Sequence, residues 1–167
     1  CAWSRELAMD PAEGPLSRVF LPCRGVIHSR PELALTILPH MVVDKLVAGG
    51  ERVLTELLAE INTVLRESAA STNMASAERA VQACFLLLDT LDKWSTPSSS
   101  TRRKHQRKST TSESDSWGDV VEWIVTLFEH LSYPTLVSAA LRIHAYGRAL
   151  RYFEVHLRKL ARTKRML

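Results

Sequence analysis

Apolar residues recur along most of the chain at the three- and four-residue spacing of an amphipathic helix. The clearest run covers residues 51–66, where the repeated positions are Leu54, Leu57, Leu58, Ile61, Val64 and Leu65. An earlier helix is predicted from Pro31 to Val47. Pro39 predicts a kink or a break near Leu38, because proline has no N–H for an interior helical position. The "AGG" that ends at Gly50 predicts the stop, since glycine readily takes a left-handed cap conformation.

Further helices are predicted downstream at the same spacing. One starts near Ser76 and carries Ala80, Val81, Cys84, Leu87, Leu88, Leu91 and Trp94. The next begins near Ser116 and carries Trp117, Val120, Val121, Ile124, Leu127, Phe128 and Leu131, until "SYP" breaks it. A last stripe follows Pro134 and comprises Leu136, Ala140, Ile143, Gly147, Leu150, Phe153, Leu157 and Leu160. It fits either one long helix or a hairpin with a tight turn around His144–Ala145.

Two segments lack this pattern. Residues 1–30 hold several prolines and glycines with little periodicity, so an irregular N-terminal segment is expected there. Residues 95–116 contain no large apolar residue and cannot bury enough surface to offset the entropy of ordering. They are predicted to form a long disordered surface loop, which is basic and rich in serine and threonine.

The absence of any useful period-two alternation predicts an all-α fold. Helices of about 15–18 residues with one broad apolar face favour an α-solenoid of antiparallel hairpins, of the HEAT or TPR kind. A compact bundle is the competing packing. The predicted organisation is an irregular segment over 1–30, HEAT-like helices over 31–94, the loop over 95–116, and further helical repeats over 117–167.

The composition narrows the class of protein. The 167 residues are 46% apolar, which is ordinary for a folded chain. Three cysteines with no CxxC spacing favour a reducing compartment over a disulfide framework. No uninterrupted apolar run approaches the roughly 18 residues that span a bilayer, so no membrane partner is expected. Because the chain starts with Cys1 and ends in a basic helix, we interpret it as part of a longer protein.

No catalytic, cofactor-binding or metal-binding residue is predicted. Cys84 lies within "ACFLLL" and is interpreted as core packing rather than a nucleophile. The histidines are dispersed without an HExxH arrangement, and "AGGER" lacks the order of a phosphate-binding loop. No kinase catalytic loop or DFG sequence is present in these residues.

Positive charge gathers in two places. A basic block, Arg102, Arg103, Lys104, Arg107 and Lys108, fits a nuclear localisation signal or a solvated linker. The stretch from Arg142 to Leu167 carries eight arginines or lysines against Glu154 alone. A nucleic-acid contact would use such charges. A solvated helix face is the simpler interpretation, because cations suit a helix C-terminus.

The same stretch carries a family resemblance. "PTLVSAALRIHAYGRALRYFEVHL" resembles the start of the FAT region of phosphatidylinositol-3-kinase-related protein kinases, most closely the ATR-type checkpoint kinases. The matching positions of that signature are Ala145, Tyr146, Arg148, Ala149, Leu150, Tyr152, Phe153 and Glu154. In this interpretation Ala145 and Ala149 admit a facing helix, while Tyr146 and Phe153 fill grooves. His144 departs from the family pattern, which usually has a small or polar residue there.

Upstream segments resemble the same family in the same order. "ELALTILPHMVVDKLVAGGERVLTELLAEINTVL" is similar to its HEAT-type segment, and "CFLLLDTLDKW" is similar to the helix that follows. The resemblance covers roughly residues 30–160. It implies that residues 117–167 open the FAT region.

The resemblance implies a function for a parent chain. That chain would be a nuclear serine/threonine kinase of the DNA damage checkpoint and DNA repair, using ATP and magnesium, with an ATRIP-type partner and an indirect link to single-stranded DNA. These residues would be a non-catalytic scaffold within it, packed against the rest of the kinase chain. The alternative is an independent helical adaptor that binds nucleic acid or a protein partner through its basic C-terminal helix.

Overall fold

The computed structural model describes residues 17–30, 32–95 and 113–165. These residues form six helices and no strand, which confirms the all-α prediction. The helices are α2 (Ser17–Ser29), α3 (Glu32–Ala70), α4 (Met74–Ser95), α5 (Glu113–His130), α6 (Tyr133–Arg142) and α7 (Tyr146–Arg165). The predicted loop lies outside the described residues apart from its two ends, since α4 extends to Ser95 and α5 begins at Glu113.

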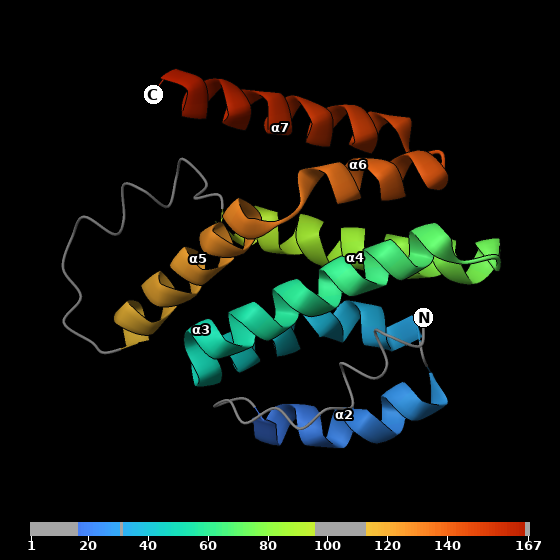
Figure 1. The fold of residues 1–167 in the computed structure, drawn as a ribbon. Coiled ribbons are helices and arrows are strands. Elements are labelled where there is room, and N and C mark those ends of the chain that lie inside the picture. Colours follow the sequence, from blue (N-terminus) through green and yellow to red (C-terminus); the bar gives the residue numbers. More distant parts are fainter. Residues whose placement is uncertain (1–16, 31, 96–112, 166–167) are drawn as a thin grey trace.

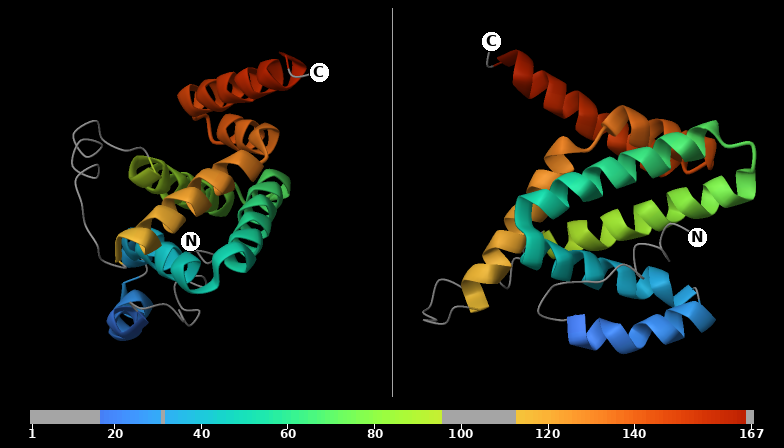
Figure 2. Two further views of the ribbon diagram at one scale, coloured as in Figure 1. Left: turned by 90° about the vertical axis from the view of Figure 1, so that its left-hand side faces the viewer. Right: turned by 60° about the horizontal axis from the view of Figure 1, so that its bottom comes forward.

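The successive pairs α2–α3, α3–α4, α4–α5 and α6–α7 pack against one another, and α3 also packs against α5 and α6 (Figure 1). The second half of α3 and α4 lie side by side, α5 crosses them, and α6 leads to α7. The two views of Figure 2 place α2 and α7 at opposite ends of the molecule. This stack of neighbouring helical pairs agrees with the predicted helical solenoid.

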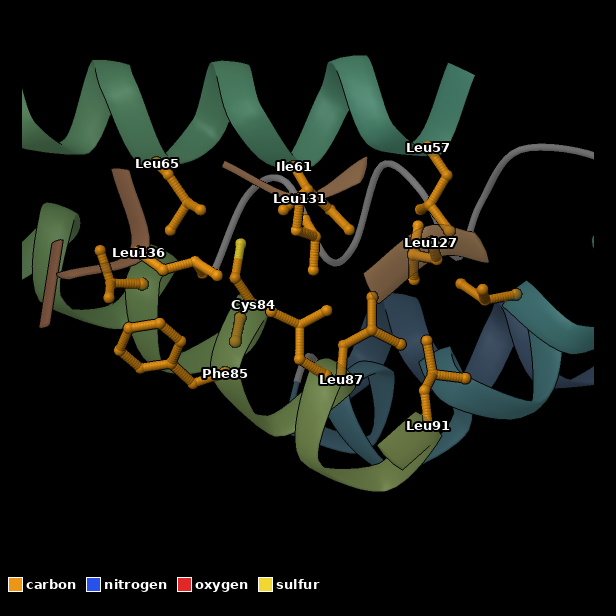
Figure 3. Close-up of a cluster of buried hydrophobic side chains, with 14 of the residues drawn as sticks. Leu57, Ile61, Leu65, Cys84, Phe85, Leu87, Leu91, Leu127, Leu131 and Leu136 are labelled. Carbon is orange, nitrogen blue, oxygen red and sulfur yellow. The ribbon is translucent and has the colours of Figure 1, made fainter. Parts of the chain in front are cut away.

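The core is formed around α4. Leu57, Ile61 and Leu65 from α3 face α4, as Figure 3 shows. The side chains that α4 directs into this core are Val81, Cys84, Phe85, Leu87, Leu88 and Leu91. Leu127, Leu131 and Leu136 from the α5–α6 segment close the cluster. The stripes predicted for residues 51–66 and 76–94 are therefore buried as expected.

Gly50 divides α3 into two helical halves. Its φ of 52° and ψ of −130° are the only non-helical dihedral angles recorded inside α3, so the predicted stop lies where the "AGG" indicated. A Cβ atom at Gly50 would lie 3.5 Å from the Trp123 ring of α5, so the bend also brings α5 close to the backbone. By length and composition α3 could cross a membrane. In this structure α3 is bent at Gly50, and both of its halves contribute buried residues to the packed core.

Pro39 does not break α3, so the break that was the alternative to a kink near Leu38 does not occur. The helix continues through Pro39, and Leu38, Met41 and Val42 are buried around it. Packing on this face compensates for the hydrogen bond that proline cannot donate.

The prediction of an irregular segment over residues 1–30 is wrong for residues 17–29. Helix α2 forms there with Pro22 inside it. It buries Phe20 and Ile27 against Ala34 and Met41 of α3 in a small second cluster. The positions of Phe20, Cys23 and Ile27 carry a helical spacing that Pro22 and Gly25 obscured in the sequence.

The last stripe forms a hairpin, with a turn at His144 between α6 and α7. His144 has a φ of 57°, the conformation that ends a helix in a Schellman motif. The amide of Ala145 donates to the carbonyl of Ala140 at 2.9 Å, and that of His144 donates to Leu141 at 3.1 Å. The His144 ring also lies 3.0 Å from the Tyr146 hydroxyl, measured from Nδ1.

Replacing Gly50 with alanine is expected to lower the free energy of unfolding by about 1–3 kcal/mol, because a side chain is strained at this φ and ψ. Urea denaturation followed by circular dichroism measures the effect. Gly118→Ala is the matched control, because Gly118 is a helical residue with open space where the Cβ would lie. That variant is expected to be about 0.5–1 kcal/mol more stable. Equal effects at both positions would contradict the strain argument.

His144→Gly is expected to raise the free energy of unfolding by about 0.5–1 kcal/mol, since glycine takes the left-handed conformation without steric cost. His144→Val is the opposing variant and is expected to destabilise, because a β-branched side chain is disfavoured at positive φ. Both are measured by urea denaturation. A destabilised glycine variant would show that the His144–Tyr146 contact outweighs the backbone strain.

Candidate functional site

Among the described residues, the buried cysteine is Cys84. In residues 17–30, 32–95 and 113–165, no cluster of three or more His, Cys, Asp or Glu could hold a metal ion. Burial, with a smaller contribution from the charge of Glu60, raises the pKa of the Cys84 thiol to about 12. The thiol therefore stays protonated at neutral pH and packs as an apolar side chain. The candidate site is a surface, and it lies on α7.

Two ion pairs connect α7 to the C-terminal half of α4. The guanidinium of Arg148 donates two hydrogen bonds to the carboxylate of Asp89, at 2.8 and 2.5 Å. One turn further along both helices, Arg151 donates to Asp92 at 2.8 Å. The hydrogen bonds to Asp89 are the main cause that raises the pKa of Arg148. Asp89 is the more buried of the two carboxylates, with 26% of its side chain exposed against 41% for Asp92.

Aromatic rings fill the space beneath these ion pairs. The Arg148 guanidinium lies 5.2 Å from the centre of the Phe85 ring, in cation–π geometry. Tyr152 lies 5.7 Å from the same ring and 6.5 Å from Tyr133. Burial, followed by the charge of Asp89, raises the pKa of Tyr152. Lys159 covers Tyr133 from α7 and donates a hydrogen bond to the backbone carbonyl of Glu129.

A groove of about 710 Å³ lies between α4, α5 and α7. Its floor is apolar and comprises Leu88, Val125, Phe128, Tyr133, Tyr152 and Val155. Asp89 and Asp92 lie at its α4 side, and Arg151 forms an ion pair with Asp92 there. Arg158, Lys159 and Arg162 line its α7 side. Within the described part of the chain, Arg158 forms an ion pair with Glu154 of its own helix, at 3.7 Å.

The structure splits the predicted signature between two faces of α7. Ala149 and Tyr152 are buried, with 5% and 9% exposed, and Ala145 is half-buried. Arg148 points to Asp89, and the exposed Glu154 pairs with Arg158. Tyr146, Leu150 and Phe153 are instead exposed by 63%, 60% and 49%. Tyr146 and Phe153 therefore fill no groove within the described residues, while Ala149 is buried.

The predicted stripe of α7 thus faces away from the protein body, since Leu157 and Leu160 are also about half exposed. The opposite face, which the sequence indicated as solvated, buries Ala149 and Tyr152. Arg148 and Arg151 on this side pair with carboxylates that lie 59 residues earlier. Separation of that size hides the pairing from any local pattern. The Asp-x-x-Asp of α4 and the Arg-x-x-Arg of α7 are the signal that sequence reasoning missed.

Several predicted residues lie outside the described part. The basic block of Arg102, Arg103, Lys104, Arg107 and Lys108 falls within residues 96–112, so the localisation signal and the disordered loop stay predictions. The side chain of Trp117 is likewise outside the description.

Asp89→Asn is expected to lower the free energy of unfolding by about 1 kcal/mol, because it removes a partly buried bidentate ion pair. It also weakens the cation–π contact of Arg148 with the Phe85 ring. Asp92→Asn is the matched control, and its more exposed pair is expected to change stability by less than about 0.5 kcal/mol. Urea denaturation at low and high salt checks both. An Asp89 effect no larger than the Asp92 effect would contradict the importance of the bidentate pair.

Comparison with known proteins identifies the family. Residues 13–166 match the family model described as the M-HEAT region of serine/threonine-protein kinase ATR. The chain is 31% identical over 182 residues to serine/threonine-protein kinase ATR of Arabidopsis thaliana, covering 93% of this chain and 7% of that protein. It is 28% identical over 180 residues to the ATR proteins of Oryza sativa subsp. indica and subsp. japonica, covering 94% of this chain and 7% of each.

No solved structure matches the chain significantly. The chain spans about 7% of the length of the curated relatives that it matches. The family match covers α2 to α7, including the bend at Gly50 and the ion pairs of α7. The chain therefore belongs to the M-HEAT region family of ATR-type serine/threonine-protein kinases.

Proposed function

We propose that these residues act as a scaffold in a DNA damage checkpoint kinase, stacking between other helical repeats and carrying no catalytic group themselves. The proposal is supported by the family membership and by the chemistry of the described residues. The buried Cys84 thiol, whose pKa is raised to about 12, fits a role in core packing.

The outer face of α7 is the observation that carries this proposal. Tyr146, Leu150, Phe153, Leu157 and Leu160 recur at four- and three-residue steps, and each is 47–63% exposed. Leu141 of α6, 49% exposed, adds to the same outward-facing apolar set. A continuous apolar stripe of this kind is typical of a repeat that stacks against a neighbouring helix.

The parent chain supplies the chemistry in this proposal. A kinase domain outside these residues binds ATP and magnesium, and it phosphorylates Ser/Thr-Gln sites in the nucleus. An ATRIP-type subunit links the parent to single-stranded DNA. These features rest on the resemblance of this chain to ATR-type kinases.

The proposal also includes the start of the FAT region, which the sequence signature places at residues 117–167. The M-HEAT family model extends across that boundary to residue 166. The hairpin α6–α7 is accordingly proposed as the junction at which the FAT repeats pack.

Leu150→Asp with Phe153→Asp tests the scaffold proposal. In the 167-residue chain the double variant is expected to change the free energy of unfolding by less than about 1 kcal/mol, because both side chains are already exposed. In the longer kinase chain the same variant is expected to lower phosphorylation of a Ser-Gln peptide by about tenfold or more, because it places charges in a helix interface.

Leu86→Asp is the matched control, since Leu86 is 45% exposed on α4 and lies outside the α7 stripe. It is expected to leave the longer chain active. Full activity of the double variant would contradict the stacking role. Phosphorylation of the Ser-Gln peptide by the 167-residue chain alone, with ATP and magnesium, would contradict the scaffold proposal itself.

A further inference from the structure

The groove between α4, α5 and α7 has the chemistry of a binding site that the scaffold role does not use. Val125, an apolar side chain that is 45% exposed, lines the groove together with other apolar residues. The stacking stripe of α7 lies on a different face of that helix, so the groove stays separate from the proposed repeat interface.

Charge is distributed unevenly along the groove. At one end Asp89 and Asp92 are occupied by Arg148 and Arg151. At the other end Arg158 and Arg162 are exposed on the C-terminal half of α7, beside Lys159. The contact between Arg158 and Glu154 is long at 3.7 Å and joins side chains that are 74% and 54% exposed. Such a pair is weak, and an incoming anion can replace it.

We propose that this groove binds a peptide segment of a protein partner that carries an apolar side chain followed by acidic residues. The apolar side chain lies over Val125, Phe128 and Val155. The carboxylates, or a phosphate in their place, meet the guanidinium groups of Arg158 and Arg162, which bind carboxylate and phosphate in bidentate geometry.

Nucleic acid fits the groove less well. The carboxylates of Asp89, Asp92 and Glu129 line it and repel a continuous phosphate backbone. Tyr152 is buried and Lys159 covers Tyr133, so neither ring offers an open face for stacking a base. A peptide with its charges at one end meets Arg158 and Arg162 and keeps its carboxylates away from Asp89 and Asp92. For the same reason, a peptide with acidic residues at one end fits the groove better than a protein surface that is acidic throughout.

Fluorescence anisotropy with the 167-residue chain tests the proposal. The probe is a fluorescein-labelled peptide in which one leucine and one phenylalanine precede four glutamates. It is expected to bind, and the same peptide with serine in place of the two apolar residues is expected to bind at least about tenfold more weakly. Replacing the glutamates with lysines is expected to abolish binding.

Two variants locate the site. Arg158→Glu with Arg162→Glu, and separately Val125→Asp, are each expected to weaken binding of the probe about tenfold or more. Their matched controls are Arg66→Glu with Arg79→Glu, and Leu86→Asp, which change exposed residues outside the groove and are expected to retain full affinity. All these positions are solvent-exposed, so the variants are expected to fold, and circular dichroism verifies their helix content.

Three outcomes would overturn the proposal. The first is no saturable binding of the probe, and the second is equal loss in the groove variants and their controls. The third is tighter binding of a single-stranded oligonucleotide that the Arg158 and Arg162 changes abolish, which would assign the groove to nucleic acid. Because none of these measurements uses kinase activity, failure here leaves the test of the scaffold role unaffected.

Discussion

The burial of α4 is the interaction on which the rest of the structure depends. Cys84, Leu87, Leu88 and Leu91 are at most 1% exposed, and they meet α3 and the α5–α6 segment from different sides. Full burial of each large apolar side chain contributes about 1.5–3 kcal/mol, so this one helix supplies much of the apolar contact. The bend at Gly50 serves the same core, because it turns the second half of α3 along α4 and brings the backbone to Trp123.

The polar edge of α4 contacts α7 through ion pairs. α7 packs closely on α6, and its contact with α4 is made largely by long side chains, the arginines that reach Asp89 and Asp92. Because arginine spans several ångströms with a charged head and an apolar stem, it positions a helix without closing the space beneath it. The groove between α4, α5 and α7 is a consequence of that arrangement.

The sequence predicts local features well and distant pairings poorly. The stripe from Leu54 to Leu65, the stop at Gly50 and the break before Pro134 follow from spacing and backbone chemistry within a few residues. The orientation of α7 does not follow from the local sequence, because this helix has two faces that can be buried. One face carries apolar residues, and the other carries tyrosine, alanine and paired arginines. The face that turns inward meets residues far away in the sequence, since Tyr152 packs on Phe85 and Arg148 pairs with Asp89 of α4, 59 positions away. Likewise, α2 was missed because Pro22 and Gly25 outweigh a short apolar repeat until Met41 and Ala34 are present to cover it.

The two ends of the stack bear on how the unit is used. A solenoid that stops in water needs a polar outer face on its terminal helices. At one end α7 exposes Leu150 and Phe153, and at the other α2 exposes Val19 and Leu21 by 61% and 62%. Neither end helix therefore has the character of a cap, while the core between them is complete. A unit with a finished interior and two apolar ends is suited to transmit position between neighbours on both sides, which is the mechanical role proposed for it within an ATR-type kinase.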